Sequence, residues 1–239
     1  MRRVPLALFA FLSLLAFWGS GFLAIRVGLE GFPPFFFMAC RFLLAGTLLF
    51  VLLAARGTRL PSAREWGFVC IEALLLMVGG GGGVAYAQLT IGSGLAAVGI
   101  ATVPIWVALF SGFLGQWPNR MEWAGIAIGF GGVLLLNLKG ELRADPRGAA
   151  FLFTSAVTWA LGSILSRRLP LPAGLMAAAS EMLAGGLMMI PIGYLLGERL
   201  TSLPPIRPLL GLLYIAIPGS AVAFSAYVYL LQNVRPALA

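Results

Sequence analysis

The feature that most constrains this chain is a series of long apolar segments that carry almost no charge. A helix needs about 20 mostly apolar residues to cross the hydrocarbon core of a bilayer. Such runs, separated by charged residues, Pro and Gly, cover approximately residues 5–25, 33–55, 66–88, 93–115, 121–138, 148–166, 174–197 and 208–231. The connections are too short for a soluble domain. We therefore expect an all-α, polytopic helical bundle embedded in the lipid bilayer.

Composition agrees with a membrane protein and narrows its chemistry. Hydrophobic residues make up 60% of the chain and charged residues 10%, whereas soluble domains carry about 25% charged residues. Histidine is absent, which removes the commonest general base and the commonest transition-metal ligand. We therefore expect no metal and no cofactor. Cys40 and Cys70 fall within apolar runs and are expected to pack as small apolar side chains.

The basic charge is interpreted as a topology signal. The formal net charge of +8 comes mostly from Arg residues between apolar runs, where the positive-inside bias places them. We therefore expect no nucleic-acid partner. A cytoplasmic N-terminus puts nine Lys and Arg residues on the cytoplasmic side and six on the outer side, and this is the predicted orientation. Arg2 and Arg3 resemble the start of a signal peptide, but the long apolar run without a cleavage pattern predicts a retained helix.

The sequence contains an internal repeat. Three pairs of segments match at an offset of 140 or 141 residues: AFWGSGFLAIR (16–26) with VTWALGSILSR (157–167), RFLLAG (41–46) with EMLAGG (181–186), and AYAQL (85–89) with AYVYL (226–230). We expect a first five-helix repeat over residues 1–140. A second repeat over 145–239 has three helices and the start of a fourth, which predicts that about two helices are missing from it. An odd number of spans inverts the second copy.

Further segments carry a family resemblance. They are WGSGFLAIRVGLEGFPP (18–34), RFLLAG (41–46), SGLAAVGIATVPIWVALFS (93–111), MEWAGIAIGFGGVLLLN (121–137) and YVYLLQNVRPALA (227–239). In their order and spacing the sequence resembles an EamA-type permease of the drug/metabolite transporter superfamily. The resemblance implies two inverted five-helix repeats, here cut short after about eight helices, and export of small metabolites, amino acids or drugs across the inner membrane. Relatives often carry Asn in the glycine stretch and Glu near position 87, where this chain has Gly and Ala.

The glycine run Gly79–Gly83 interrupts the third predicted span and has two interpretations. Small residues allow close helix packing. Alternatively, the run is a hinge or locally unwound segment beside a transport path. At an offset of 141 residues Gly79 matches Ser220, beside Pro218 and Gly219, and interrupted helices at matching places in two halves point to a transporter's site. Pro104 marks a further break in the fourth span. The candidates from these breaks are Gly79, Gly80, Gly81, Pro104 and Ser220.

Three charged residues lie well inside predicted spans: Arg41, Glu72 and Glu181. Charges within the membrane are costly and mark functional sites. Counted along the helices, the depths of Arg41 and Glu181 differ by about 7 Å, so one alternative is a structural ion pair or charges satisfied by backbone groups. The other is that Glu181 or Glu72 carries a coupling proton.

Aromatic residues complete the candidate cavity, and they also have two interpretations. Trp18, Trp159, Tyr86 and Tyr227 could stack on a ligand or could pack in the core. The leading hypothesis is a secondary transporter that exports a small, mostly apolar or amphipathic molecule by alternating access. Since Arg41 is the one cation clearly inside, strongly phosphorylated substrates are disfavoured. The alternatives are a truncated remnant without transport activity and a membrane-embedded lipid-modifying enzyme. Because no cluster of acids exists, we expect no enzyme.

Overall fold

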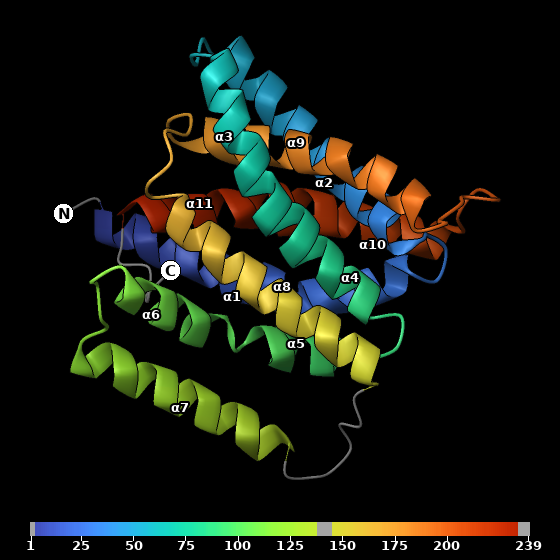
Figure 1. Cartoon of the computed structure of the whole chain (residues 1–239). Helices are drawn as coiled ribbons and strands as arrows, with labels where there is room; N and C mark the ends of the chain where they lie inside the picture. Colours follow the sequence, from blue (N-terminus) through green and yellow to red (C-terminus); the bar gives the residue numbers. More distant parts are fainter. Residues whose placement is uncertain (1–2, 138–144, 234–239) are drawn as a thin grey trace.

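The computed structural model describes residues 3–137 and 145–233, and within these residues every regular element is a helix. Figure 1 shows them packed side by side as a bundle. The elements in chain order are α1 (Arg3–Gly28), α2 (Pro34–Ala55), α3 (Ala63–Ala73), η1 (Leu74–Gly82), α4 (Gly83–Ala87), α5 (Ser93–Ile100), α6 (Val103–Phe113), α7 (Arg120–Asn137), α8 (Pro146–Leu165), α9 (Leu175–Leu195), α10 (Ile206–Ala216), η2 (Ile217–Val222) and α11 (Ala223–Asn233).

Seven helical segments of the described chain are long and apolar enough to cross a membrane. They are Leu8–Gly28, Pro34–Ala55, Ala63–Ala87, Ser93–Phe113, Pro146–Leu165, Leu175–Leu195 and Ile206–Tyr227. These correspond to seven of the eight predicted spans. The remaining predicted span forms helix α7, but it is not among the seven, and polar Arg120, Glu122 and Asn137 at its ends shorten its apolar part.

Local signals in the sequence explain where the helices begin and end. Ser62 and Glu65 form a reciprocal capping box at the start of α3. This cap explains why the third span begins three residues before the predicted boundary at 66. Asp145 caps α8 by accepting hydrogen bonds from the backbone N–H groups of Arg147 and Gly148. The fourth span breaks between α5 and α6, beside Pro104, as the sequence predicted.

Two π-helical stretches interrupt spans at the places where the repeat predicted interruptions. Helix η1 contains Gly79 to Gly82 and continues directly from α3 into α4. Helix η2 contains Ser220 and joins α10 to α11. A π-helix is rare and often found at functional sites. Because η1 and η2 are themselves helices, the backbone remains helical at both places. A helical backbone satisfies its hydrogen bonds in lipid better than an unwound segment would.

The core of the bundle is formed by α2, α9, η1 and α8. Helix α2 packs along α9, and α8 packs against η1, while α1 contacts α10 and α11. Helix α7 lies at the outer edge of the bundle, beyond α5 and α6 (Figure 1). A Cβ atom added at Gly125 or Gly129 of α7 would meet nothing within 4 Å. Cavities for small molecules must therefore be sought among the other helices.

Candidate functional site

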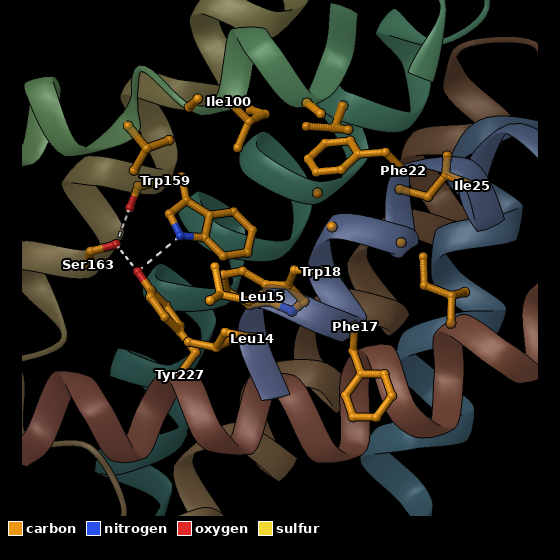
Figure 2. A pocket seen from close by; sticks show the side chains of 18 of the residues that line it. Leu14, Leu15, Phe17, Trp18, Phe22, Ile25, Ile100, Trp159, Ser163 and Tyr227 are labelled. Atoms are coloured by element: carbon orange, nitrogen blue, oxygen red, sulfur yellow. Dashed lines mark hydrogen bonds between the residues drawn. The ribbon is translucent and has the colours of Figure 1, made fainter. Parts of the chain in front are cut away.

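A cavity of about 470 Å³ lies between helices of the bundle, and its walls are almost entirely apolar. Some of the residues that line it, such as Phe11 and Leu15, are exposed. Residues from α1, α2, η1, α4, α5, α6, α8, α10 and α11 line it. Figure 2 shows the view into this cavity, with Phe17, Phe22 and Ile25 of α1 on its wall. It is called the aromatic cavity below. Its size is within the range of about 300–1,000 Å³ that is usual for small-molecule sites.

Three aromatic rings meet at one end of the aromatic cavity. The ring centroids of Trp18 and Trp159 are 5.3 Å apart in an edge-to-face arrangement, and the Trp18 and Tyr227 centroids are 5.0 Å apart. The Trp159 indole N–H donates a hydrogen bond of 3.0 Å to the Tyr227 hydroxyl. Ser163 forms a further hydrogen bond with that hydroxyl (Figure 2). The two repeat-related tryptophans thus lie in direct contact and share Tyr227 as a neighbour.

Arg41 is the one charged residue among the described residues that line the aromatic cavity. It is 9% exposed. Its Nε donates to Ser220 Oγ at 2.6 Å, and its Nη2 makes a longer bond of 3.4 Å to the carbonyl oxygen of Gly219. Ser220 Oγ in turn donates to the Ile215 carbonyl oxygen at 3.0 Å. The guanidinium therefore ties α2 to the π-helix η2 while it faces the cavity.

A second cavity of about 460 Å³ contains the two buried carboxyl groups, and it is called the acidic cavity below. Glu72 of α3 and Glu181 of α9 line it, together with Ser166 and Arg167 at the end of α8. Glu72 is 0% exposed and Glu181 1% exposed. Both Oε atoms of Glu72 and Oε2 of Glu181 have no hydrogen-bond partner among the described residues. Since buried charges without partners are very costly, a bound proton or cation would relieve this arrangement.

The two cavities are neighbours along α8. Ser163 lines the aromatic cavity, and Ser166, about one helical turn later, lines the acidic cavity. Trp159 and Ser163 of α8, which are hydrogen-bonded to Tyr227 of α11, thus lie on the part of α8 that precedes the acidic cavity.

Six of the predicted site residues line the aromatic cavity, and five do not. Those in it are Trp18, Arg41, Gly81, Pro104, Trp159 and Tyr227. Ser220 contacts it through Arg41, and Glu181 lines the acidic cavity. The Tyr86 ring packs elsewhere, 4.5 Å from the Phe151 ring. Gly79 and Gly80 lie against Thr158 and Trp159 of α8, respectively.

The ion pair that the sequence allowed between Arg41 and Glu181 is not formed. The only ion pairs among the described residues are Arg59–Glu65 and Arg207–Glu30. Similar depth along two helices says nothing about the direction of each side chain around its axis. Arg41 points to η2, whereas Glu181 points to the cavity that it shares with Glu72.

The glycine run serves close packing. A Cβ at Gly79 would lie 2.8 Å from Thr158 Oγ1, and one at Gly82 would lie 2.8 Å from Phe35 Cε1. A Cβ at Gly80 would overlap the Trp159 ring. The absence of side chains therefore lets α8 approach η1 and lets Trp159 settle against it. Of the predicted glycines Gly79 to Gly81, Gly81 lines the aromatic cavity.

Some site residues escaped the sequence analysis. Ser163 lies four residues after Trp159, so the helical i, i+4 spacing could have indicated it. Glu72 was recognised as a charge inside a span, but its partnership with Glu181 depends on how α3 packs on α9. The Glu198 carboxylate accepts hydrogen bonds from the backbone N–H groups of Phe35 and Phe36 at the start of α2. It completes a helix N-terminus from a distant loop, which no local pattern reveals.

Comparison with known proteins identifies the family. The family model described as the EamA-like transporter family matches residues 5–138 and 146–239. The chain belongs to the EamA-like transporter family. It is 42% identical over 231 residues to the uncharacterized inner membrane transporter YedA of Escherichia coli K12, covering 96% of this chain and 76% of YedA. The resemblance to the drug/metabolite transporter superfamily is thus confirmed, and the chain is a membrane transporter.

The chain also resembles more distant proteins. A probable terminal-alkyne amino-acid exporter of Streptantibioticus cattleyicolor is 25% identical, and the match covers 95% of this chain and 77% of that protein. One solved crystal structure superposes with a TM-score of 0.78 at 22% identity, covering 98% of this chain and 82% of that one. At this level of identity the structural match supports the helical membrane fold alone.

Proposed function

We propose that the chain is a secondary transporter that exports small amphipathic metabolites, amino acids or drugs across the inner membrane by alternating access. The observation that carries this proposal is the aromatic cavity of about 470 Å³, which gathers six of the predicted site residues. Its apolar walls suit a substrate with an apolar body. The relative from Streptantibioticus cattleyicolor is a probable amino-acid exporter by name, which is consistent with a substrate of this size.

Inverted repeats are part of this proposal, and contacts between α2 and α9 support them. These helices carry the repeat-related segments RFLLAG (41–46) and EMLAGG (181–186). A Cβ at Gly46 would lie 2.9 Å from the Leu183 backbone nitrogen, and one at Gly186 would lie 3.1 Å from the Leu43 backbone nitrogen. Each glycine thus accepts the backbone of the other helix. Such reciprocal contacts are what a pseudo-two-fold axis between two halves would produce.

A coupling proton is the proposed second partner. Glu72 and Glu181 are buried and line the same cavity, next to the aromatic cavity. Three of their four carboxyl oxygens have no hydrogen-bond partner among the described residues. Carboxylic acids inside a membrane are the residues that proton relays use. We assign the coupling proton to this pair. The proposal also places the N-terminus of the chain in the cytoplasm.

Gradient-driven flux tests the proposed function. The purified full chain is reconstituted in liposomes, and radiolabelled tryptophan, norleucine and phenylacetate are followed with and without a proton gradient. We expect at least one probe to move faster in the presence of the gradient. Gly19 lines the cavity, and a Cβ there meets nothing within 4 Å, so Gly19→Phe should fill the cavity without backbone strain and stop the flux.

A matched control is Gly129→Phe on α7, where an added Cβ also meets nothing within 4 Å. This variant should transport like the native chain. Equal flux through the native chain and Gly19→Phe would contradict a role for the cavity. Absence of any protein-dependent flux would contradict the proposed function.

A further inference from the structure

The charge inside the aromatic cavity has no counter-charge in the protein. Arg41 lies within the span Pro34–Ala55 and is 9% exposed. Neither of the ion pairs found among the described residues involves it. Burying a charged side chain in a membrane without a partner is costly. The described residues of the protein therefore supply no negative charge to balance Arg41, and an anionic ligand can supply it.

The guanidinium also retains free hydrogen-bonding capacity. Arginine has five N–H donors, and the described contacts of Arg41 are Ser220 Oγ, the Gly219 carbonyl oxygen and a weak 3.7 Å contact to Met38 Sδ. The guanidinium also lies over the Phe42 ring, with Cζ 4.8 Å from the ring centroid. The well-formed bond to Ser220 uses Nε and leaves the terminal nitrogens with weak acceptors. These are the atoms that bind a carboxylate through parallel hydrogen bonds. Ser220 thus fixes the orientation of the planar guanidinium fork and leaves the N–H donors of its two terminal nitrogens, Nη1 and Nη2, for a ligand.

The rest of the cavity defines the remainder of the ligand. Apart from Arg41, the described residues that line it carry no charge, and Trp18, Phe22 and Trp159 are among them. A dianionic phosphate needs several cations, and a cationic ligand would face Arg41 without a carboxylate nearby. The complement of one guanidinium among aromatic rings is one carboxylate attached to an apolar group.

Resting on the proposed transport function and extending it to the substrate, we propose that the aromatic cavity binds monocarboxylates with an aromatic or aliphatic body, and that Arg41 binds the carboxylate. Ser220 is a positioning residue, since it holds the guanidinium from η2. The aromatic cluster at Trp18 and Trp159 receives the apolar part.

Binding of matched acids and amides tests this assignment without any flux. Equilibrium dialysis of the purified full chain in detergent uses radiolabelled 3-phenylpropionate, with 3-phenylpropionate, 3-phenylpropanamide and 3-phenylpropylamine as competitors. We expect the acid to compete at about tenfold to hundredfold lower concentration than the amide, the range that a charged hydrogen bond contributes. This preference should disappear in Arg41→Gln and persist in weakened form in Arg41→Lys, which keeps the charge but loses the fork.

The control is Arg64→Gln, which removes an exposed arginine at the start of α3 and should keep the native preference. Absence of acid binding, equal competition by acid and amide, or displacement by inorganic phosphate as effective as by the acid would overturn the assignment. If both Arg41 variants fail to fold, the acid-to-amide ratio of the native chain decides. A chain that binds the acid selectively but shows no flux would support this assignment and contradict transport. Equal flux of acid and amide would support transport and contradict this assignment.

Discussion

At the scale of single residues, the site is built from side chains whose polar atoms lack an opposite charge. Arg41 faces the aromatic cavity, and Glu72 and Glu181 face the acidic cavity. In each case the membrane interior makes an unpaired charge expensive, so a ligand or a proton gains binding energy by neutralising it. Because Arg41 lies in one cavity and the two carboxyl groups lie in the other, an anion and a proton can bind independently.

The carboxyl pair gives the first prediction. Glu72→Gln and Glu181→Gln each remove a titratable group while keeping its size, so an inward proton gradient should no longer accelerate export. Exchange of labelled for unlabelled probe without a gradient should continue, because the aromatic cavity is unchanged. Radiotracer flux with imposed pH gradients measures both. Glu30→Gln serves as the control, since Glu30 pairs with Arg207 outside the cavities; retained acceleration in both acidic-cavity variants would exclude the pair as proton carriers.

The second prediction concerns the Tyr227 hydroxyl. Tyr227→Phe removes the acceptor of the Trp159 indole N–H and the partner of Ser163. Hydrogen bonds between membrane helices contribute about 0.6 kcal/mol on average and up to about 1.7 kcal/mol, and we expect a loss of unfolding free energy within that range. Unfolding in mixed micelles measures it. Tyr194→Phe, at an exposed position, should leave stability unchanged, and an equal loss in both variants would argue against the cluster.

At the scale of elements, the glycines of η1 determine how closely α8 approaches. A Cβ added at Gly79 or Gly80 of η1, or at Gly83 at the start of α4, would come within 3 Å of Thr158, Trp159 or Ser155 of α8, respectively. A side chain at these places would push α8 outward and move Trp159, which forms part of the cavity. The cost of five weak helix formers in a row is thus offset by tight packing of two helices.

Gly80→Ala tests this packing. Its Cβ would overlap the Trp159 ring, and overpacking of this kind costs about 1–3 kcal/mol. We therefore expect lower thermal stability and altered tryptophan fluorescence. Gly129→Ala on α7 is the matched control, because its Cβ meets nothing, and alanine there should be neutral or stabilising by up to about 1 kcal/mol. Equal behaviour of the two variants would mean that the glycine run does not set the helix distance.

At the scale of the whole molecule, the arrangement places both cavities between helices from the two halves of the sequence. The aromatic cavity combines α1, α2 and α6 with α8 and α11, and the acidic cavity combines α3 with α9. Relative movement of the halves would change both cavities together. This is the geometry that alternating access requires.

The orientation of the bundle gives the last prediction. Leu60 lies in the loop after α2, and Thr201 lies in the loop after α9. Single cysteines at these exposed positions, in a chain with Cys40 and Cys70 replaced by alanine, should differ in labelling of intact cells. If all eight predicted spans cross, α7 included, and the N-terminus is cytoplasmic, the two loops lie on opposite sides of the membrane. We then expect a membrane-impermeant maleimide to label Thr201→Cys in intact cells and Leu60→Cys only after lysis. The opposite pattern would reverse the topology.

The sequence by itself determined the class of fold, seven of its membrane spans, the family and the places of the helix interruptions. These features follow from local requirements, since the bilayer demands about 20 apolar residues per span and Pro, Gly and capping residues act on their own helix. The capping box at Ser62 was equally local and could have corrected the boundary at 66. The repeat arrangement remains a prediction.

Tertiary structure alone decided which candidates share a cavity. Tyr86 and Tyr227 occupy matching positions in the repeat, yet Tyr227 lines the aromatic cavity while Tyr86 packs on Phe151. Arg41 binds Ser220, 179 residues away, and Glu181 shares a cavity with Glu72. Hydropathy fixes how deep a residue lies along its helix. The direction of its side chain depends on how that helix rotates and packs against distant segments, which is a property of all the contacts together.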